Sequence, residues 1–402
     1  MPRKILLTGA TGALGPHLAA ELLAANAGDN VNALVRATAI SARDRFDRWV
    51  RTVCAIRRPG DEFAPDASRL HLVAGDMGKE GLGMDAGERR ALARETEVII
   101  HAAADTKFRG SADAQWDINV EGTRKMLDWA ATCPRLRQFI LVSTICVAGK
   151  NGGRIPEMPL APHGFVNEYE RTKWEAERLA LASGMPVRIA RVGIVMGSRE
   201  TGVVHRLGAL HHVLRWFGRG LIPLVPGTPR SSVELISVEM VARFLARAAA
   251  DDAVALAPDK TIWHVTAGRR AVRLEDLMEF TWEQFNPGSA TRGTRRGEKG
   301  RIVDAETFER LRQASNSRRD PALGHLIESI DSFLPGLLYP RSFETARAET
   351  LWGGELPVED WRQTLGRVIR YIEQRPTRKA AELVCSAESA QGHEQSQSIG
   401  FQ

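Results

Sequence analysis

Short apolar runs alternate with segments of helical hydrophobic spacing along the first half of the chain. Runs typical of buried strands occupy residues 4–7, 31–35, 70–74, 98–103, 139–143 and 187–192. Segments with the 3.6-residue period of amphipathic helices lie between them, at 16–26, 41–56, 88–95, 119–131 and 169–182. Strands separated by helices of this length pair in parallel through right-handed crossovers. The pattern therefore predicts an α/β fold with a doubly wound, Rossmann-type parallel sheet.

The regular alternation weakens after Gly197, which predicts a second region. Residues 203–226 end in a cluster of Pro and Gly, whereas 233–250 again have the pattern of a strand and a helix of the main sheet. We expect a Rossmann domain at 1–196 and 231–261, and a smaller, discontinuous substrate-binding region toward the C-terminus at 197–230 and 262–377. Residues 378–402 are rich in Ser, Gln and Glu, which predicts a disordered tail.

Composition narrows the functional classes. Of the 402 residues 43% are hydrophobic, enough for a sizeable core, and no window has the uninterrupted apolar length of a membrane span. The apolar run after Arg3 and Lys4 is too short for a signal peptide, so we expect a cytoplasmic protein. The four cysteines have no metal-ligand spacing, and the net charge of +6 comes without a nucleic-acid motif. We expect neither a metal nor a nucleic-acid partner.

A glycine-rich loop, TGATGALG at residues 8–15, joins the first predicted strand to the first predicted helix. Gly9 permits a tight turn, Gly12 lets the backbone approach a pyrophosphate, and Gly15 lets helix and strand pack closely. Free N–H groups at the helix start attract phosphates. This combination of strand, spacing and helix predicts dinucleotide binding.

The residue after the second predicted strand indicates which dinucleotide binds. An NAD site usually has a carboxylate there for the ribose hydroxyls, but this chain has Arg36. A guanidinium binds the 2′-phosphate of NADP with two hydrogen bonds. Arg36 therefore favours NADPH/NADP, and Arg45 is a candidate second contact; the alternative is that either side chain faces solvent.

Two further strand ends are candidates for cofactor contact. Asp76 follows the third predicted strand, where a carboxylate can accept a hydrogen bond from the adenine amino group, although it can also serve only as a turn residue. The small residues 102–104 let a cofactor lie against the backbone. His101 stands beside them on a buried strand and is interpreted as a core histidine.

Tyr169 and Lys173 are four residues apart at the start of a predicted helix, so they share one face. An ammonium held close to a phenol favours the phenolate and lowers its pKa toward the range useful for proton transfer. Thr144, at the end of the preceding strand, can donate a hydrogen bond to a substrate carbonyl oxygen. We expect Thr144, Tyr169 and Lys173 to be the catalytic residues.

As a set, the motifs TGATGALG, GDM, HAAA, NVEGT, VSTICVAG and NEYERTK, between about residues 4 and 250, resemble the extended short-chain dehydrogenase/reductases. The resemblance implies that Tyr169 is the proton donor, that Lys173 binds the nicotinamide ribose, and that Thr144 holds the reacting oxygen. The expected cofactor-binding residues are Gly9, Thr11, Gly12, Ala13, Leu14, Gly15, Arg36, Arg45, Asp76, Met77, Ala102, Ala103, Ala104, Asn119 and Lys173.

The segments LVRATAISARDRF, LVAGDMGKEGLGM, VIIHAAADTKF and NEYERTKWEAERL are similar to the male-sterility branch of these enzymes, which contains thioester reductase domains, carboxylic acid reductase terminal domains and fatty acyl-CoA reductases. This resemblance implies reduction of an acyl thioester by NADPH to an aldehyde, and sometimes on to the alcohol. The substrate would arrive on free CoA or on an acyl carrier protein. The chain departs from the branch at Ala102, usually Asn, and at Val192, usually Pro.

The segment 203–225 carries apolar residues at helical spacing, with Arg206, Arg215 and Arg219 interleaved. It is either an amphipathic helix over the core or a lid for an acyl chain whose arginines meet CoA phosphates or an acidic carrier surface. Two other functions stay open: an NADP(H)-dependent alcohol or ketone oxidoreductase acting on a sterol, hydroxy acid or natural-product ketone, and a non-catalytic NADP-binding regulatory protein. The oligomeric state is left open.

Overall fold

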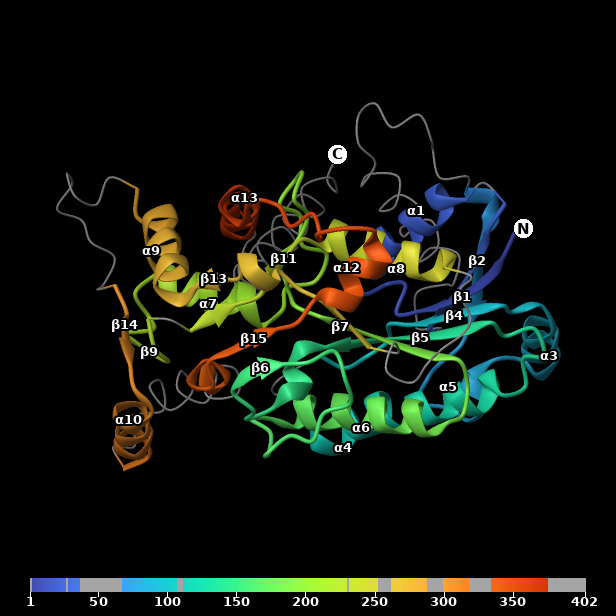
Figure 1. Ribbon diagram of the computed structural model, residues 1–402, viewed down its shortest axis with the longest axis horizontal. Helices are drawn as coiled ribbons and strands as arrows, with labels where there is room; N and C mark the ends of the chain where they lie inside the picture. The colour runs from blue at the N-terminus through green and yellow to red at the C-terminus, as the bar shows by residue number, and fades with distance from the viewer. Residues whose placement is uncertain are drawn as a thin grey trace, which may run out of the picture.

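The computed structural model describes residues 2–26, 28–36, 67–106, 111–229, 231–251, 262–287, 299–317 and 334–374. Its central element is a parallel seven-stranded sheet (Figure 1). In chain order the strands are β1 (Lys4–Thr8), β2 (Asn30–Val35), β3 (Leu70–Ala74), β4 (Val98–His101), β5 (Gln138–Thr144), β7 (Val187–Val192) and β12 (Ile262–Val265). Their spatial order is β12-β7-β5-β4-β1-β2-β3. The predicted doubly wound Rossmann-type sheet is confirmed.

The sheet has its switch point between β1 and β4. The chain builds from β1 outward to β3, returns to place β4 against the other side of β1, and then builds away through β5, β7 and β12. Thr8 at the end of β1 is in register with His101 at the end of β4. A crevice outside the carboxyl ends of two such strands is where open α/β sheets bind ligands.

Helices cover both faces of the sheet (Figure 1). On one face lie α1 (Gly15–Ala25), α8 (Val238–Ala250) and α12 (Ala346–Trp352), and on the other α3 (Ala86–Glu95), α5 (Gly122–Ala130) and α6 (Glu168–Ala182). The short helix α4 (Ala112–Trp116) runs through the π-helical segment Asp117–Glu121 into α5. Leu18 and Phe244 belong to the apolar core of the first face, and Met126 and Phe139 to that of the second.

A second lobe has its own apolar core, which includes Leu214, Phe217 and Ile369. Its helices are α7 (Ala209–Gly218), α9 (Leu274–Phe285), α10 (Ala305–Ser317) and α13 (Trp361–Gln374). Four strand pairs complete it and join it to the main domain: β8 (Ile194–Val195) with β11 (Leu235–Ile236), β9 (Leu224–Pro226) with β14 (Arg301–Val303), β10 (Ser232–Val233) with β13 (Val272–Arg273), and β6 (Gly153–Ile155) with β15 (Arg341–Phe343).

Two expected assignments around the domain boundary are wrong. The strand expected from residue 233 does not join the main sheet, because β10 and β11 pair with β13 and β8, whereas the helix expected after it is α8, which covers one face of that sheet. The last strand of the main sheet is instead β12, which pairs with β7 and begins at Ile262, where the substrate-binding region was expected to start. A four-residue edge strand carries too short a pattern to be separated from other apolar runs. Downstream, α12 also packs on the main domain, against β12 and α8.

Several expectations fall on residues outside the described ranges. These are the predicted helix 41–56 with Arg45, and the predicted tail 378–402. Within the described ranges, no helix combines the length and apolarity needed to cross a membrane. The same part of the chain contains no cluster of three or more His, Cys, Asp or Glu arranged to hold a metal ion. Cys133 and Cys146 are free thiols.

Candidate active site

The glycine loop sits at the switch point of the sheet. Gly9 has φ +74°, and a Cβ there would lie 2.6 Å from the carbonyl carbon of Ala102, so only glycine fits against the end of β4. A Cβ on Gly15 would lie 2.2 Å from the carbonyl oxygen of Ala10, which explains the close approach of α1 to the loop. The N-cap residue of α1 is Leu14, which offers no side-chain acceptor. The helix therefore begins with N–H groups that suit an anion.

One cavity, of about 210 Å³, extends from this loop toward the ends of β2 and β3. Arg36 lies at the end of β2 and lines it. Asp76 and Met77 follow β3, and the Asp76 carboxylate accepts a hydrogen bond from Gly78 N at 3.0 Å. The remaining predicted residues that line it are Gly9, Thr11, Gly12, Ala102, Ala103 and Ala104. The structure thus gathers the residues expected at the adenosine end of a dinucleotide.

His101 is a satisfied core histidine, as predicted. Its Nε2 donates to Thr123 Oγ1 (3.1 Å), because Thr123 Oγ1 itself donates to Asn119 O. Its Nδ1 then accepts from Thr8 Oγ1 at 2.8 Å. Burial lowers the pKa of His101 to about 3, with a smaller contribution from the Lys173 charge, so the ring is neutral at physiological pH.

Asn119 was expected to contact the cofactor. It lines neither the cavity just described nor the second cavity, which contains the predicted catalytic residues; these two are called the cofactor-side cavities below. Its Oδ1 accepts from Asp105 N (2.8 Å), and its Nδ2 donates to Asp105 O and Thr172 Oγ1, both at 3.0 Å. The side chain therefore fastens the loop after β4 to α6. A buried amide has a limited set of donors and acceptors, and here the protein itself satisfies them. Gly15, on the helix side of the loop, also lies outside both linings.

A second cavity, of about 280 Å³, continues from the glycine loop to the predicted catalytic residues. Thr144 ends β5, and its Oγ1 accepts from Cys146 N at 3.2 Å. Asn167 caps α6 by accepting from Glu170 N at 2.9 Å, which places Tyr169 in the first turn. Thr144 and Tyr169 both line this cavity, and the Thr144 hydroxyl acts on the pKa of the Tyr169 phenol. Lys173, one turn later, lines the same cavity, which brings the predicted catalytic residues together beside the glycine loop.

Burial, rather than Lys173, decides the ionisation of Tyr169. Desolvation raises the pKa of Tyr169, Cys146 and Glu170 add to the effect, and the Thr144 hydroxyl opposes it. Lys173 Nζ donates to Val142 O at 2.9 Å, and burial lowers the Lys173 pKa to about 8 while Glu177 works against that. The expected lowering of the tyrosine pKa by the neighbouring ammonium is therefore wrong for this structure. Tyr169 is held as a protonated phenol, which suits a proton donor.

Sequence reasoning missed the buried network beneath this site. Ser143 Oγ donates to Glu177 Oε1 at 2.5 Å, so its hydroxyl is engaged with a carboxylate, whereas Thr144 lines the cavity together with Tyr169. Glu177 also binds the fully buried guanidinium of Arg191. The sequence did show that Glu177 lies four residues after Lys173 and so shares its helix face. It did not show the partner, because Arg191 lies on β7, which only the fold brings close to α6.

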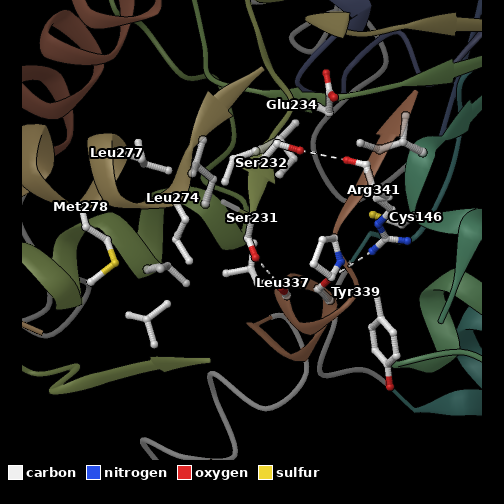
Figure 2. A pocket seen from close by; sticks show the side chains of 18 of the residues that line it. Cys146, Ser231, Ser232, Glu234, Leu274, Leu277, Met278, Leu337, Tyr339 and Arg341 are labelled. Atoms are coloured by element: carbon white, nitrogen blue, oxygen red, sulfur yellow. Dashed lines mark hydrogen bonds between the residues drawn. The ribbon is translucent and has the colours of Figure 1, made fainter. Parts of the chain in front are cut away.

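A third cavity, of about 120 Å³, has many apolar side chains in its lining, among them those of α7 and α9 (Figure 2). Leu274, Leu277 and Met278 lie at one side of the view, and Cys146 and Arg341 at the other. The wall from α7 consists of Leu210, Val213, Leu214 and Phe217. The hydrophobic stripe of α7 was predicted, whereas the contributions of 274–281 and 336–343 were missed because those segments are remote in sequence.

The apolar cavity and the cavity of the catalytic residues adjoin at the end of β5 and the start of α6. Thr144 and Tyr169 line one of them, while Cys146 and Glu170, their near neighbours in sequence, line the other. Burial raises the pKa of Glu170 to about 7, against the hydrogen bond from Val166 N and the charges of Arg341 and Lys150. The two cavities therefore lie on neighbouring residues of the same two elements, β5 with the turn that follows it and the first turn of α6.

Two of the interleaved arginines in the segment 203–225 differ in their environments. Arg215 is 7% exposed and donates to Ile372 O, so it does not reach an acyl-CoA phosphate or a carrier surface. Arg206 is exposed and lines both cofactor-side cavities. The expectation of a phosphate-binding arginine is therefore wrong for Arg215.

Comparison with known proteins agrees with the fold. The chain is 33% identical over 222 residues to isonitrile lipopeptide synthase of Streptomyces coeruleorubidus, covering 53% of this chain and 14% of that protein. It is 31% identical over 177 residues to fatty acyl-CoA reductase 8 of Arabidopsis thaliana, covering 41% and 35%. The chain thus spans only a minor part of the length of these curated relatives.

Among solved structures, the terminal R domain from the myxalamid PKS-NRPS biosynthetic pathway matches with a TM-score of 0.70 at 23% identity, over 92% of both chains. That likeness shows a shared fold. The family described as male sterility protein, whose members have an NAD(P)-binding domain, matches residues 7–245, more than half of the chain. The protein therefore belongs to the male sterility protein family, as the resemblance of its motifs indicated.

Proposed function

We propose that this protein is an NADPH-dependent reductase that converts an acyl thioester to an aldehyde. The observation that carries the proposal is that Thr144 and Tyr169 line one cavity while Cys146 and Glu170, their near neighbours in sequence, line a second one. One has the glycine loop and Lys173 in its lining, and the other is largely apolar. Such an arrangement suits a dinucleotide on one side and an acyl chain on the other.

The residues present fit NADPH. The loop at Gly9 and Gly12, with the uncapped start of α1, suits the pyrophosphate. Arg36, at the end of β2, suits the 2′-phosphate, and Asp76 the adenine. Lys173 lines the cavity on the catalytic side, where it suits the nicotinamide ribose. NADPH, when bound, supplies the hydride for the reduction.

The chain's own residues handle the oxygen of the substrate. The Thr144 hydroxyl donates a hydrogen bond to the thioester carbonyl oxygen as negative charge develops on it. Tyr169 then gives its phenolic proton to that oxygen, which yields a neutral hemithioacetal. A phenol kept protonated by burial is a suitable donor for this step. The C–S bond of the hemithioacetal then breaks, releasing the thiol and an aldehyde, and a second hydride transfer would give the alcohol.

The acyl thioester is supported by the shape and chemistry of the third cavity. Its apolar lining from α7 and α9 suits an acyl chain, and the polar side chains at its other end, among them Cys146, Glu170 and Arg341, lie beside the catalytic residues. The matched relatives are named as a lipopeptide synthase and a fatty acyl-CoA reductase. The thioester is therefore proposed to arrive on CoA or on an acyl carrier protein.

The experiment that tests this function follows NADPH oxidation and free thiol together, with acyl-CoAs of graded chain length beside simple ketones and with NADH in parallel. We expect one thiol released per aldehyde formed, a preference for NADPH, and a much slower reaction in Tyr169→Phe. NADPH oxidation with ketones alone, without thiol, would show an alcohol or ketone oxidoreductase instead. Cofactor binding without turnover on any substrate would favour the regulatory protein.

A further inference from the structure

The two cofactor-side cavities share a small set of residues. Both linings contain five residues in common. Four of them come from the glycine loop and from the chain just after β4, namely Gly9, Gly12, Ala102 and Ala104, and the fifth is Arg206. One cavity leads to Arg36 and Asp76, and the other to Tyr169 and Lys173. In a dinucleotide the pyrophosphate joins the two nucleoside halves. Arg206 therefore borders the place where a pyrophosphate would lie.

The charges around this place suit an anion. Within the ranges that the structure describes, Arg206 forms no hydrogen bond or ion pair. Nearby Arg199, by contrast, is paired with Glu200 and Glu359. No Asp or Glu from the described part of the chain lines the cavity of the catalytic residues, which has the cations Lys173 and Arg206. The other cavity that Arg206 lines contains Arg36 and the carboxylates of Asp76 and Asp105, so the cavity of the catalytic residues is the more positive of the two.

Packing on both sides positions the segment that carries Arg206. On one side, the ring of His205 lies 5.3 Å from the ring of His17, which is buried in the first turn of α1. On the other side, His211 Nδ1 accepts from Gly208 N at 2.9 Å, so the ring proton is on Nε2, which donates to Met196 O at 2.8 Å. Residues 205–208 are thereby held between the pyrophosphate-facing helix and α7.

We propose that Arg206 binds the pyrophosphate of the dinucleotide from the side opposite the glycine loop, and that this contact links cofactor binding to the acyl cavity. The link is α7, which begins directly after the segment. Its residue His211 lines the catalytic cavity, whereas Leu210 and Leu214 line the apolar one. A bound dinucleotide therefore steadies one wall of the acyl cavity, which predicts that the cofactor binds before the acyl substrate.

The inference requires a dinucleotide but neither the 2′-phosphate nor a thioester, so it is separable from the proposed function. The test is isothermal titration of NADPH and NADH into the wild-type chain and the variants Arg206→Ala, Arg36→Ala and Arg219→Ala. We expect Arg206→Ala to lower the affinity for both dinucleotides by the same factor. The loss should be about 10-fold, as for one exposed charge-assisted contact. Arg36→Ala should lower the affinity for NADPH alone. Arg219→Ala should change the affinity for neither dinucleotide.

Unchanged affinity for both dinucleotides in Arg206→Ala would overturn the contact, and so would a loss confined to NADPH, which would place Arg206 at the 2′-phosphate. Either result leaves thioester reduction standing. Arg206 is exposed, so the variant should fold, and its thermal unfolding without cofactor should match that of the wild type.

The link to α7 has its own readout in amide hydrogen exchange. In the wild type we expect NADPH, at saturation, to slow exchange both in the glycine loop and in residues 203–214. In Arg206→Ala at saturating NADPH, protection of the glycine loop should remain while protection of 203–214 is lost. Equal protection of 203–214 in the two proteins would reject the coupling.

Discussion

Glu177 and Arg191 form a doubly hydrogen-bonded ion pair inside the protein, with Nε to Oε1 at 3.0 Å and Nη2 to Oε2 at 2.8 Å. Arg191 is 0% and Glu177 2% exposed. Glu177 follows Lys173 by one turn of α6, and Arg191 lies on β7. His264 on β12 accepts from Arg191 Nη1 at 3.3 Å, because its Nδ1 proton is donated to Glu344 O. The pair thus fastens the helix of the proposed catalytic residues to the sheet.

Replacing one partner of this pair should destabilise the fold. In Glu177→Leu the Arg191 guanidinium stays buried without its carboxylate, and we expect a loss of about 3–5 kcal/mol in the free energy of unfolding, measured by urea denaturation. The double variant Glu177→Leu/Arg191→Met should recover most of that loss, because the Arg191 charge is removed together with its carboxylate. A single variant as stable as the wild type would contradict the importance of the pair.

The pH dependence of activity should report Lys173. Its pKa is lowered to about 8, so the ammonium is present below that pH and is lost as the pH rises through it. The rate should therefore fall on the alkaline side with a limb near pH 8. Because the Glu177 charge raises the Lys173 pKa, Glu177→Gln should move this limb to lower pH. Glu175→Gln, on the same helix and paired with Arg178, is the matched control and should leave the limb unmoved.

Tyr169→Phe should separate chemistry from binding. The variant removes the proton donor and leaves the ring, so we expect the rate constant of reduction to fall by about 10²–10⁴-fold. Affinity for NADPH, measured by titration, should stay within about twofold because the phenol is not proposed to hold the cofactor. Tyr371→Phe, on α13 in the second lobe, is the control and should reduce neither quantity. A Tyr169→Phe enzyme of normal rate would exclude Tyr169 as the donor.

Filling the apolar cavity should change the preferred acyl length. Met278 lies on α9, away from Cys146 and Arg341 (Figure 2). In Met278→Trp the larger ring shortens the space for the chain, so kcat/KM should drop for long acyl-CoAs and stay nearly unchanged for short ones. Glu283→Trp adds the same ring at an exposed position of α9 and should change kcat/KM for neither long nor short acyl-CoAs. A parallel drop for all chain lengths would place the acyl group elsewhere.

Glu234 should make stability depend on pH near neutrality. Burial raises its pKa to about 7 from 4.5, against hydrogen bonds from the Gly268 and Ala267 backbone. The native state therefore holds this proton more tightly than the unfolded state, and stability falls as the pH rises from 4.5 through 7. Glu234→Gln keeps the acceptor for Gly268 N and cannot ionise, so the fall should be smaller in melting curves recorded across this range. A variant with the wild-type pH dependence would refute the assignment.

Much of the main domain was predictable because its signals are local. The strands of the main sheet up to β7 are short buried runs bounded by turns, and the loop at Gly9 depends on neighbours within one supersecondary unit. Tyr169 and Lys173 share a helix face through their spacing alone. Asn119, predicted to contact the cofactor, instead forms hydrogen bonds with Asp105 and Thr172, which the sequence did not indicate. Which residues become the hydrogen-bond partners of Asn119 depends on how α6 packs against the loop after β4.

The sequence by itself determined the alternation of strands and helices, the glycine loop and the Tyr169–Lys173 spacing, since each depends on residues within a few turns of one another. Only the tertiary structure decided that β12 ends the sheet, that Arg191 meets Glu177, and that Arg206 borders the glycine loop. It also decided the protonation of Tyr169, because burial raises the pKa of the phenol and outweighs the opposing effect of the Thr144 hydroxyl. Long-range contacts and desolvation depend on how distant segments pack, and no local pattern in the chain encodes them.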